Sequence, residues 1–181
     1  MHIKNNKHFI LGGARSGNSP HAERVIQHYF VESQSTSTVY YIATAEALDQ
    51  EMRLRIERHQ NDRQNQNIDF EWNLIEEPIQ LGKIIESVEH SDIALIDCLT
   101  LWISNCLHHE SWSSQKPAFI ETILSSKATI VMASNEVGQG IVPMGQLSRQ
   151  FVDESGWLHQ QLSPICDHVE FVTAGLIQRL K

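Results

Sequence analysis

The sequence predicts an α/β fold built on a mainly parallel central sheet. Short runs rich in β-branched or aromatic residues alternate with helix-compatible stretches. The runs are apolar throughout, as expected for strands covered on both faces. Polar residues gather directly after them, where the carboxyl ends of parallel strands form ligand sites. The predicted strands are residues 9–11, 39–43, 93–96, 129–133 and 169–173.

The stretches between these runs complete the expected order of elements. Helices are predicted at residues 21–29, at about 46–60, at 99–107 and at 147–162. Polar connections are predicted as loops at residues 33–37, 61–67 and 111–116. A chain of 181 residues is most simply one domain, spanning 1–181, and is long enough to bury a substantial core.

Composition excludes several classes of protein. The net charge of -8 argues against a general binder of nucleic acid or of a membrane surface, although a local basic site remains compatible with it. Cys98, Cys106 and Cys166 have no zinc-like spacing, and their odd number predicts a reducing compartment without a fully paired disulfide framework. Residues 1–8 are polar, no secretory apolar segment follows, and the most apolar stretch, 93–103, is too short to span a bilayer. We therefore expect a cytoplasmic protein.

Residues 12–19 read Gly-Gly-Ala-Arg-Ser-Gly-Asn-Ser and match the phosphate-loop pattern G-x-x-x-x-G-K-S/T at Gly12, Gly17 and Ser19. An apolar run precedes the segment and a helix-compatible stretch follows it, which is the context such a loop requires. Its backbone N–H groups and the helix N-terminus would cradle phosphate oxygens. Asn18 stands where the pattern requires lysine, so the cradle is kept while the cation that neutralises the terminal phosphates is missing. The segment predicts a nucleotide site with altered chemistry.

A second candidate lies on the predicted helix at 46–60. Glu51, Arg55, His59 and Arg63 recur every four residues and form one stripe along its surface. The neighbouring guanidinium groups favour a neutral imidazole, which can act as a nucleophile, and they can also hold phosphate oxygens. This arrangement suits attack on a nucleotide α-phosphate to form a phosphoramidate. On spacing alone, a solvated charged face with an incidental histidine is the commoner explanation.

Asp97 ends the third apolar run and admits two interpretations. An acid in this position, opposite a phosphate loop, commonly holds Mg²⁺, with Ser19 as the ligand from the loop. Alternatively, Asp97 is the N-cap of the helix predicted at 99–107. The presence of the loop favours the metal interpretation.

Two further clusters are less specific. The segment 135–143, Asn-Glu-Val-Gly-Gln-Gly-Ile-Val-Pro, predicts an ordered loop in which Glu136 could bind a hydroxyl, a base edge or a metal. His108, His109 and Glu110 lack a third ligand at a known spacing, so they indicate a surface helix end rather than a metal site.

Several segments, in order and over nearly the whole chain, combine into one family pattern. They are Gly-Gly-Ala-Arg-Ser-Gly at 12–17, Tyr-Ile-Ala-Thr at 41–44, Asp-Gln-Glu-Met at 49–52, Arg-Ile-x-x-His-x-x-x-Arg at 55–63, Trp72 with Glu76 and Pro78, Asp-Cys-Leu-Thr-Leu-Trp at 97–102, Ser104-Asn105, Asn-Glu-Val-Gly-x-Gly-Ile-Val-Pro at 135–143, and Leu147, Arg149, Phe151, Asp153 and Gly156. Together they resemble the bifunctional adenosylcobinamide kinase / adenosylcobinamide-phosphate guanylyltransferase family of cobalamin biosynthesis. The loop alone is unspecific, whereas the histidine motif combined with the Asn-Glu-Val-Gly segment is specific.

The resemblance implies a cytoplasmic enzyme with a P-loop-type (RecA-like) three-layer sandwich, usually a homotrimer, that acts on a corrinoid and a nucleotide and binds neither nucleic acid nor a membrane. Family members phosphorylate the aminopropanol hydroxyl of adenosylcobinamide and then transfer GMP from GTP through a guanylylated histidine, which corresponds to His59. The phosphate donor, ATP or GTP, stays open, and Mg²⁺ is expected on Ser19 and Asp97. The implied nucleotide-binding residues are Gly12, Gly13, Ala14, Arg15, Ser16, Gly17, Asn18, Ser19, Arg55, Arg63, Glu76 and Asp97.

The chain departs from the family pattern at Asn18, at Pro20 after the loop, at Leu74 in place of a threonine, and at His159 in place of asparagine. Loss of a preorganised phosphate-binding cation removes on the order of 3 kcal/mol of transition-state stabilisation. Arg15 could substitute in part. We expect weak or absent kinase activity with retained guanylyl transfer. The alternatives are a catalytically degenerate nucleotide-binding or regulatory homologue, and a transferase redirected to another phosphorylated alcohol.

Overall fold

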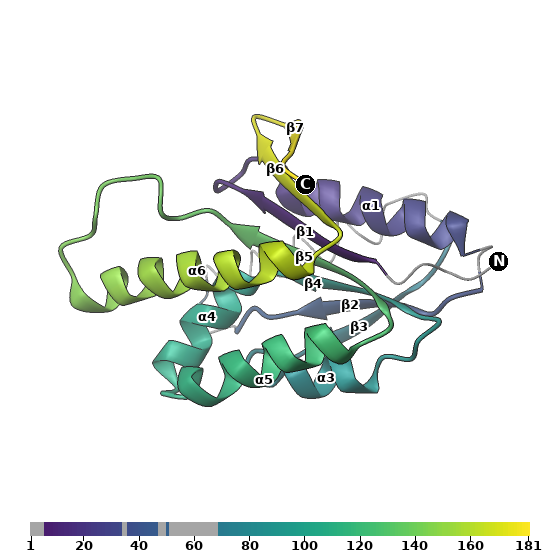
Figure 1. The fold of residues 1–181 in the computed structure, drawn as a ribbon, viewed down its shortest axis with the longest axis horizontal. Helices are drawn as coiled ribbons and strands as arrows, with labels where there is room; N and C mark the ends of the chain where they lie inside the picture. The colour runs from purple at the N-terminus through teal and green to yellow at the C-terminus, as the bar shows by residue number, and fades with distance from the viewer. Residues whose placement is uncertain (1–5, 34–35, 47–49, 51–68) are drawn as a thin grey trace.

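One seven-stranded sheet runs through the part of the chain that the structure describes. The computed structural model describes residues 6–33, 36–46, 50 and 69–181. The strands follow the order β3-β2-β4-β5-β1-β6-β7, and every neighbouring pair is parallel except β6 with β7. Their bounds are β1 (Lys7–Gly12), β2 (Val39–Ala43), β3 (Trp72–Glu76), β4 (Ile93–Asp97), β5 (Thr129–Asn135), β6 (His168–Thr173) and β7 (Leu176–Arg179). The predicted α/β fold with a mainly parallel sheet is confirmed (Figure 1).

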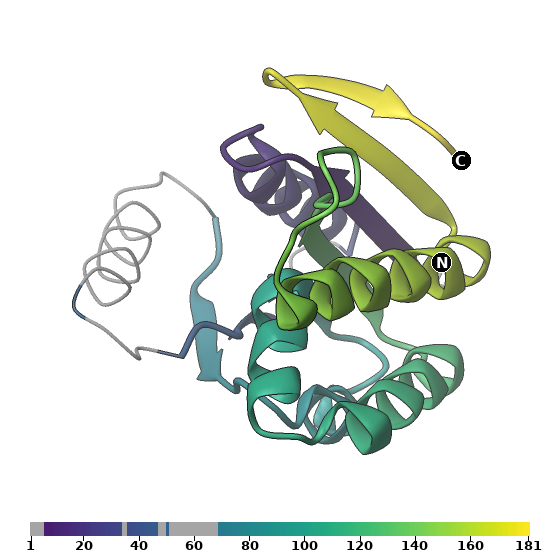
Figure 2. The same cartoon turned by 90° about the vertical axis from the view of Figure 1, so that its left-hand side faces the viewer.

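Helices cover both faces of the sheet and make the described fold a three-layer sandwich. One face carries α1 (Asn18–Glu32), and the other carries α3 (Leu81–Ser87), α4 (Leu99–His108), α5 (Trp112–Ser125) and α6 (Gln146–Ile165). Figure 2 shows α4, α5 and α6 together on one side of the strands, with β6 and β7 at one edge. No helix in the described ranges is long and apolar enough to cross a bilayer.

All five predicted strands are present, as β1, β2, β4, β5 and β6. The sequence did not predict the two edge strands. Most residues of β3 are exposed or half-buried, and all four residues of β7 are exposed, so neither forms a run buried on both faces. β7 reverses direction through a turn in which Ala174 and Gly175 both have positive φ, at 51° and 77°, as a tight hairpin turn requires.

The helices predicted at 21–29, 99–107 and 147–162 are confirmed as α1, α4 and α6. The loop predicted at 111–116 is wrong, because α5 begins at Trp112. That tryptophan is buried against Trp102 with ring centroids 5.1 Å apart, and this packing outweighs the polar composition of the segment. The short helix α3 was not predicted. The helix expected at about 46–60 and the loop at 61–67 fall almost entirely outside the described residues.

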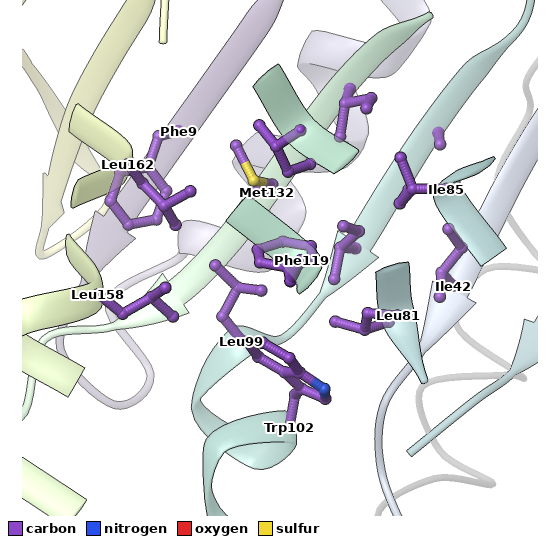
Figure 3. Close-up of a cluster of buried hydrophobic side chains, with 14 of the residues drawn as sticks. Phe9, Ile42, Leu81, Ile85, Leu99, Trp102, Phe119, Met132, Leu158 and Leu162 are labelled. Carbon is purple, nitrogen blue, oxygen red and sulfur yellow. The ribbon is translucent and has the colours of Figure 1, made fainter. Parts of the chain in front are cut away.

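Two apolar clusters hold the layers together. The larger one fills the space between the sheet and helices α3 to α6, where Trp102 packs on Phe119 with ring centroids 4.8 Å apart (Figure 3). The smaller one joins the sheet to α1 and includes Ile10 and Ile26. Successive residues of one strand enter opposite clusters, as Phe9 and Ile10 do. This double burial explains why the central strands are apolar throughout.

A buried polar group fastens the start of α1 to the sheet. The Nε2 atoms of His8 and His21 lie 2.9 and 2.6 Å from the same Glu170 Oε2, and Tyr29 Oη lies 3.3 Å from His8 Nδ1. Burial lowers the pKa of His8 despite the nearby carboxylate. Burial raises the pKa of Glu170, but hydrogen bonds from His21 and His8 outweigh it and leave the pKa lowered. The helix that follows the phosphate loop is therefore tied to β1 and β6.

The three cysteines carry buried free thiols. Burial raises the pKa of Cys98 and Cys106 to about 11 and that of Cys166 to about 12. The thiols therefore stay protonated at neutral pH. The lack of a disulfide among them agrees with the expectation from their odd number.

Replacing Trp102 with phenylalanine should destabilise the fold by about 2–4 kcal/mol. Its indole Nε1 donates to Ile79 O at 2.7 Å, so the change removes this hydrogen bond and leaves a void in the larger cluster. Urea unfolding followed by circular dichroism measures the loss. The matched control is Trp157→Phe at a side chain that is 52% exposed, with an expected change within about 0.5 kcal/mol. Equal effects of the two substitutions would contradict this account of the core.

Replacing His8 with glutamine should make stability less sensitive to acid. Because burial lowers the pKa of His8 from its ordinary value of 6.5, the unfolded chain binds this proton more readily, and the unfolding free energy falls as pH drops below about 6.5. The variant should lose less unfolding free energy than the wild type between about pH 7.5 and 5.5. His28→Gln, at a side chain that is 69% exposed, should behave like the wild type. A wild-type pH slope in the His8 variant would refute this role.

Candidate nucleotide-binding site

The predicted phosphate loop connects β1 to α1. β1 ends at Gly12, α1 begins at Asn18, and Ser16 N–H donates to Gly13 O at 3.1 Å to form a tight turn. Gly17, the N-cap, has φ 98°, and Arg15 has φ 57°. The first turn of α1 contains no acidic residue. The helix therefore presents an N-terminus suited to an anion, as the sequence pattern predicts.

Close backbone packing fixes both ends of this loop. A Cβ atom on Gly12 would lie 2.3 Å from Ser16 Oγ and 2.8 Å from Val172 O, so this position admits only glycine without a shift of backbone. Glu136 N–H donates to Gly12 O at 2.9 Å, and Gly175 N–H donates to Ser16 O at 2.8 Å. The loop is thus held between the end of β5 and the β6–β7 turn.

The polar residues that follow the strands meet at one edge of the sheet. Ala43 is in register with Asp97 and Gly12 with Asn135, so the ends of β2, β4, β5 and β1 are aligned. Glu76, at the end of β3, lies on the same edge but four strand spacings from β1, about 19 Å away. The structure therefore brings Asp97 to the phosphate loop but not Glu76.

Ser19 and Asp97 form the oxygen pair expected at a metal site. Ser19 Oγ donates to Asp97 Oδ1 at 3.1 Å, and Tyr41 Oη donates to Asp97 Oδ2 at 2.6 Å. The alternative role of Asp97 as a helix N-cap is wrong, because the N-cap of α4 is Cys98 and no side chain caps that helix. A hydroxyl and a carboxylate are the ligand types that Mg²⁺ prefers. Sequence reasoning missed Tyr41, whose role depends on the parallel register of β2 and β4.

Asn18 occupies the lysine position of the loop pattern but turns toward β5. It is 6% exposed, and its Nδ2 donates to Ser134 O at 3.3 Å and to Asn135 Oδ1 at 3.1 Å. Both amide hydrogens are therefore used within the protein. Arg15 is the one cationic residue in the sequence of residues 12–19, and it is exposed.

A chain of polar side chains lies behind the end of β5. Asn135 N–H donates to Thr100 Oγ1 at 2.6 Å, Thr100 Oγ1 lies 3.3 Å from Ser134 Oγ, and Ser134 Oγ lies 2.9 Å from His159 Nε2. The other ring nitrogen, His159 Nδ1, lies 3.6 Å from Glu136 Oε2. Burial lowers the pKa of His159, although the carboxylate of Glu136 opposes this. The sequence pointed to Glu136 and His159 separately but gave no sign that they meet.

Other residues of the family pattern tie the strand ends together. Thr44 Oγ1 donates to Cys98 O at 2.7 Å and accepts from Cys98 N–H at 3.0 Å. Asn105 Nδ2 donates to Thr44 O at 2.8 Å and to Pro78 O at 3.3 Å. These residues hold the carboxyl ends of β2, β3 and β4 in place.

The proposed nucleophile and its arginines, His59, Arg55 and Arg63, lie outside the described residues. His108 closes α4 on an exposed surface, as predicted, and His109 Nε2 lies 3.1 Å from Glu46 Oε2. Over the ranges the structure covers, no three His, Cys, Asp or Glu side chains form a ready metal cage.

Comparison with known proteins agrees with this geometry. The family described as cobinamide kinase / cobinamide phosphate guanyltransferase matches residues 8–180. The chain is 42% identical over 176 residues to the bifunctional adenosylcobalamin biosynthesis protein CobP of Pseudomonas aeruginosa, covering 95% of each chain. It is 32% identical over 189 residues to the bifunctional adenosylcobalamin biosynthesis protein CobU of Escherichia coli, covering 95% of this chain and 98% of that protein.

The protein of the same name from Salmonella typhimurium is 31% identical over 189 residues, with the same coverage. The similarity covers nearly the whole length of this chain and of each relative, so it is not confined to the phosphate loop. The match of the family to residues 8–180 also includes the histidine motif and the segment after β5. The chain belongs to the cobinamide kinase / cobinamide phosphate guanyltransferase family.

Proposed function

We propose that this protein transfers GMP from GTP to adenosylcobinamide phosphate through a guanylylated His59, and that its adenosylcobinamide kinase activity is impaired. The observation that carries the proposal is the phosphate loop with Ser19 Oγ on Asp97, in a chain that keeps Arg55, His59 and Arg63 in sequence. The description of the family and the names of the relatives, which call them bifunctional, support both half-reactions.

The guanylyl half depends on the histidine motif. A neutral His59 imidazole attacks the α-phosphorus of GTP, the bond to the bridging oxygen breaks, and pyrophosphate leaves. The resulting phosphoramidate then passes its GMP to the phosphate oxygen of adenosylcobinamide phosphate and restores the imidazole. Arg55 and Arg63 hold the phosphates through forked hydrogen bonds.

The impairment of the kinase half follows from the environment of Asn18. Its side chain has no charge, and both of its amide hydrogens are bonded to Ser134 O and Asn135 Oδ1. It therefore offers a terminal phosphate neither a cation nor a free donor. The backbone cradle and the helix N-terminus still favour nucleotide binding.

Ser19 and Asp97 are the residues that would hold Mg²⁺, since a hydroxyl and a carboxylate 3.1 Å apart match its preferred oxygen ligands. A bound Mg²⁺ ion would supply positive charge to neutralise the nucleotide phosphates. Glu76 lies at the end of β3, distant from the phosphate loop. Any contact of Glu76 with the nucleotide would therefore be with a part that lies away from the loop. We also propose that the protein is a cytoplasmic homotrimer and that residues 1–181 form a single domain.

A catalytically degenerate nucleotide-binding homologue is the second candidate. The bonded amide of Asn18 favours it, because this arrangement stabilises the loop without serving transfer. Incorporation of GMP into the protein distinguishes the two candidates.

Incubation with GTP labelled at the α-phosphate should leave an acid-labile, alkali-stable GMP adduct on the protein, whereas a γ-phosphate label should leave none. His59→Ala should abolish the adduct because no nucleophile remains. His28→Ala, at an exposed histidine of α1, is the matched control and should label fully. If the His59 variant labels as well as the wild type, the proposed nucleophile is wrong.

Asn18→Lys should raise the rate of phosphoryl transfer to adenosylcobinamide by about a hundredfold, since it restores a preorganised cation. Asn18→Gln is the neutral control and should leave the rate low. Separate assays of phosphoryl transfer and GMP incorporation measure the two half-reactions. A robust wild-type kinase rate that Asn18→Lys does not change would contradict the role assigned to Asn18.

A further inference from the structure

The carboxylate of Glu136 lies in an unexpected place for a phosphate site. Glu136 directly follows β5, and its N–H donates to Gly12 O at 2.9 Å, beside the first residue of the loop. It is therefore close to the phosphate end of a bound nucleotide rather than its base. A negative side chain there opposes phosphate binding by like-charge repulsion. Such a group is useful if it contacts a hydrogen-bond donor that approaches the terminal phosphate.

The carboxylate has room for such a ligand. Its Oε1 accepts from Gly138 N–H at 2.5 Å, and its Oε2 lies 3.6 Å from His159 Nδ1. A carboxylate offers about four acceptor positions, so these two contacts leave others open. The side chain is 20% exposed, whereas that of His159 is 7% exposed. The carboxylate of Glu136 is therefore partly open to a ligand, whereas the ring of His159 is buried.

Hydrogen-bond directions assign His159 a supporting role. A carboxylate only accepts, so the proton of a neutral His159 ring belongs on Nδ1, facing Glu136. Nε2 then accepts from Ser134 O–H, at 2.9 Å, and Ser134 Oγ accepts from Thr100 O–H, at 3.3 Å. Thr100 Oγ1 in turn accepts from Asn135 N–H at 2.6 Å. Each hydrogen bond in this series has one donor and one acceptor, and the last donor is the backbone N–H of Asn135.

Packing also fixes the orientation of the ring. The His159 ring lies against Phe9 with centroids 5.4 Å apart, and Phe9 belongs to the larger apolar cluster. Among the described residues, His159 Nδ1 has no hydrogen-bond partner at ordinary distance, and it is buried. The ring therefore holds its N–H toward the carboxylate without another acceptor competing for it.

We propose that Glu136 selects the phosphoryl acceptor at the phosphate loop. Its carboxylate accepts a hydrogen bond from the hydroxyl group of the alcohol substrate and repels the phosphate ester formed from that alcohol. His159 positions the carboxylate. The proposal rests on the proposed function for the identity of that alcohol, adenosylcobinamide. The same charge thus favours binding of the alcohol at the phosphate loop over binding of its phosphate ester there. His159 is a positioning residue and contacts neither ligand.

Calorimetric titration of the full-length protein with adenosylcobinamide and with adenosylcobinamide phosphate tests the proposal. Glu136→Gln should weaken binding of the alcohol by about tenfold, because a charge-assisted hydrogen bond is lost. It should tighten binding of the phosphate ester by about fivefold, because a repulsive charge is removed. The two dissociation constants therefore move in opposite directions.

Variants at position 159 test the positioning role without changing the charge. His159→Leu removes the donor and should weaken binding of the alcohol by about threefold. His159→Asn places an amide N–H where Nδ1 stands and should restore the affinity to within about twofold of the wild type. Circular dichroism checks the fold of each variant, and this pair carries the test if Glu136→Gln does not fold.

The proposal is overturned if Glu136→Gln shifts both dissociation constants in the same direction or changes neither, or if wild-type protein binds neither corrinoid. It is also overturned if the variant alters only the affinity for a nucleotide with Mg²⁺, which would make Glu136 a metal ligand. Incorporation of GMP at His59 is measured in a separate assay that contains no corrinoid. If the wild-type protein does not incorporate GMP, the proposed function is refuted. The corrinoid titrations then decide the role of Glu136 separately.

Discussion

The position of β1 between β5 and β6 is the constraint on which the candidate site depends. These two pairings place Gly12 level with Asn135 on one side and with Val172 on the other. The chain must then leave the sheet through a gap that a single Cβ atom would close. This exit directs α1 across the sheet, so that Ser19 reaches Asp97 although β5 separates their strands. The loop, its helix and its acidic partner are therefore consequences of one strand order.

Within residues 12–19, backbone groups supply most of the attraction for phosphate. The chain carries a net charge of -8, and Arg15 is the sole cation in the loop sequence. Asp97 and Glu136 add negative charge at its rim. Within this loop, attraction for phosphate therefore comes from N–H groups and from the N-terminus of α1, which need no charged side chain. A member of this family can therefore have Asn18 at the lysine position and keep the phosphate cradle. The cradle depends on the backbone fold, whereas the catalytic cation depends on one side chain.

Burial on both faces made the central strands predictable, because it requires runs such as 93–96 that are apolar at every position. The same reasoning could not find β3 and β7, since edge strands have exposed faces. The loop between β1 and α1, and the position of Asp97 opposite it, could be predicted from spacing. The partners of Asn18, the contact of Tyr41 with Asp97 and the pairing of Glu136 with His159 join residues distant in sequence, and only the folded register brings them together. The role of His59 stays a prediction.

The contact between Gly175 and Ser16 has a consequence for synthesis of the protein. The loop is braced by the β6–β7 turn that contains Gly175, and β1 has no complete set of neighbours until β6 is available. Because the chain leaves the ribosome from its N-terminus, the phosphate loop can reach its final shape only after β6 and the following turn have been synthesised. A nucleotide could therefore meet the loop in its final shape only after β6 and the turn at Gly175 have joined the sheet.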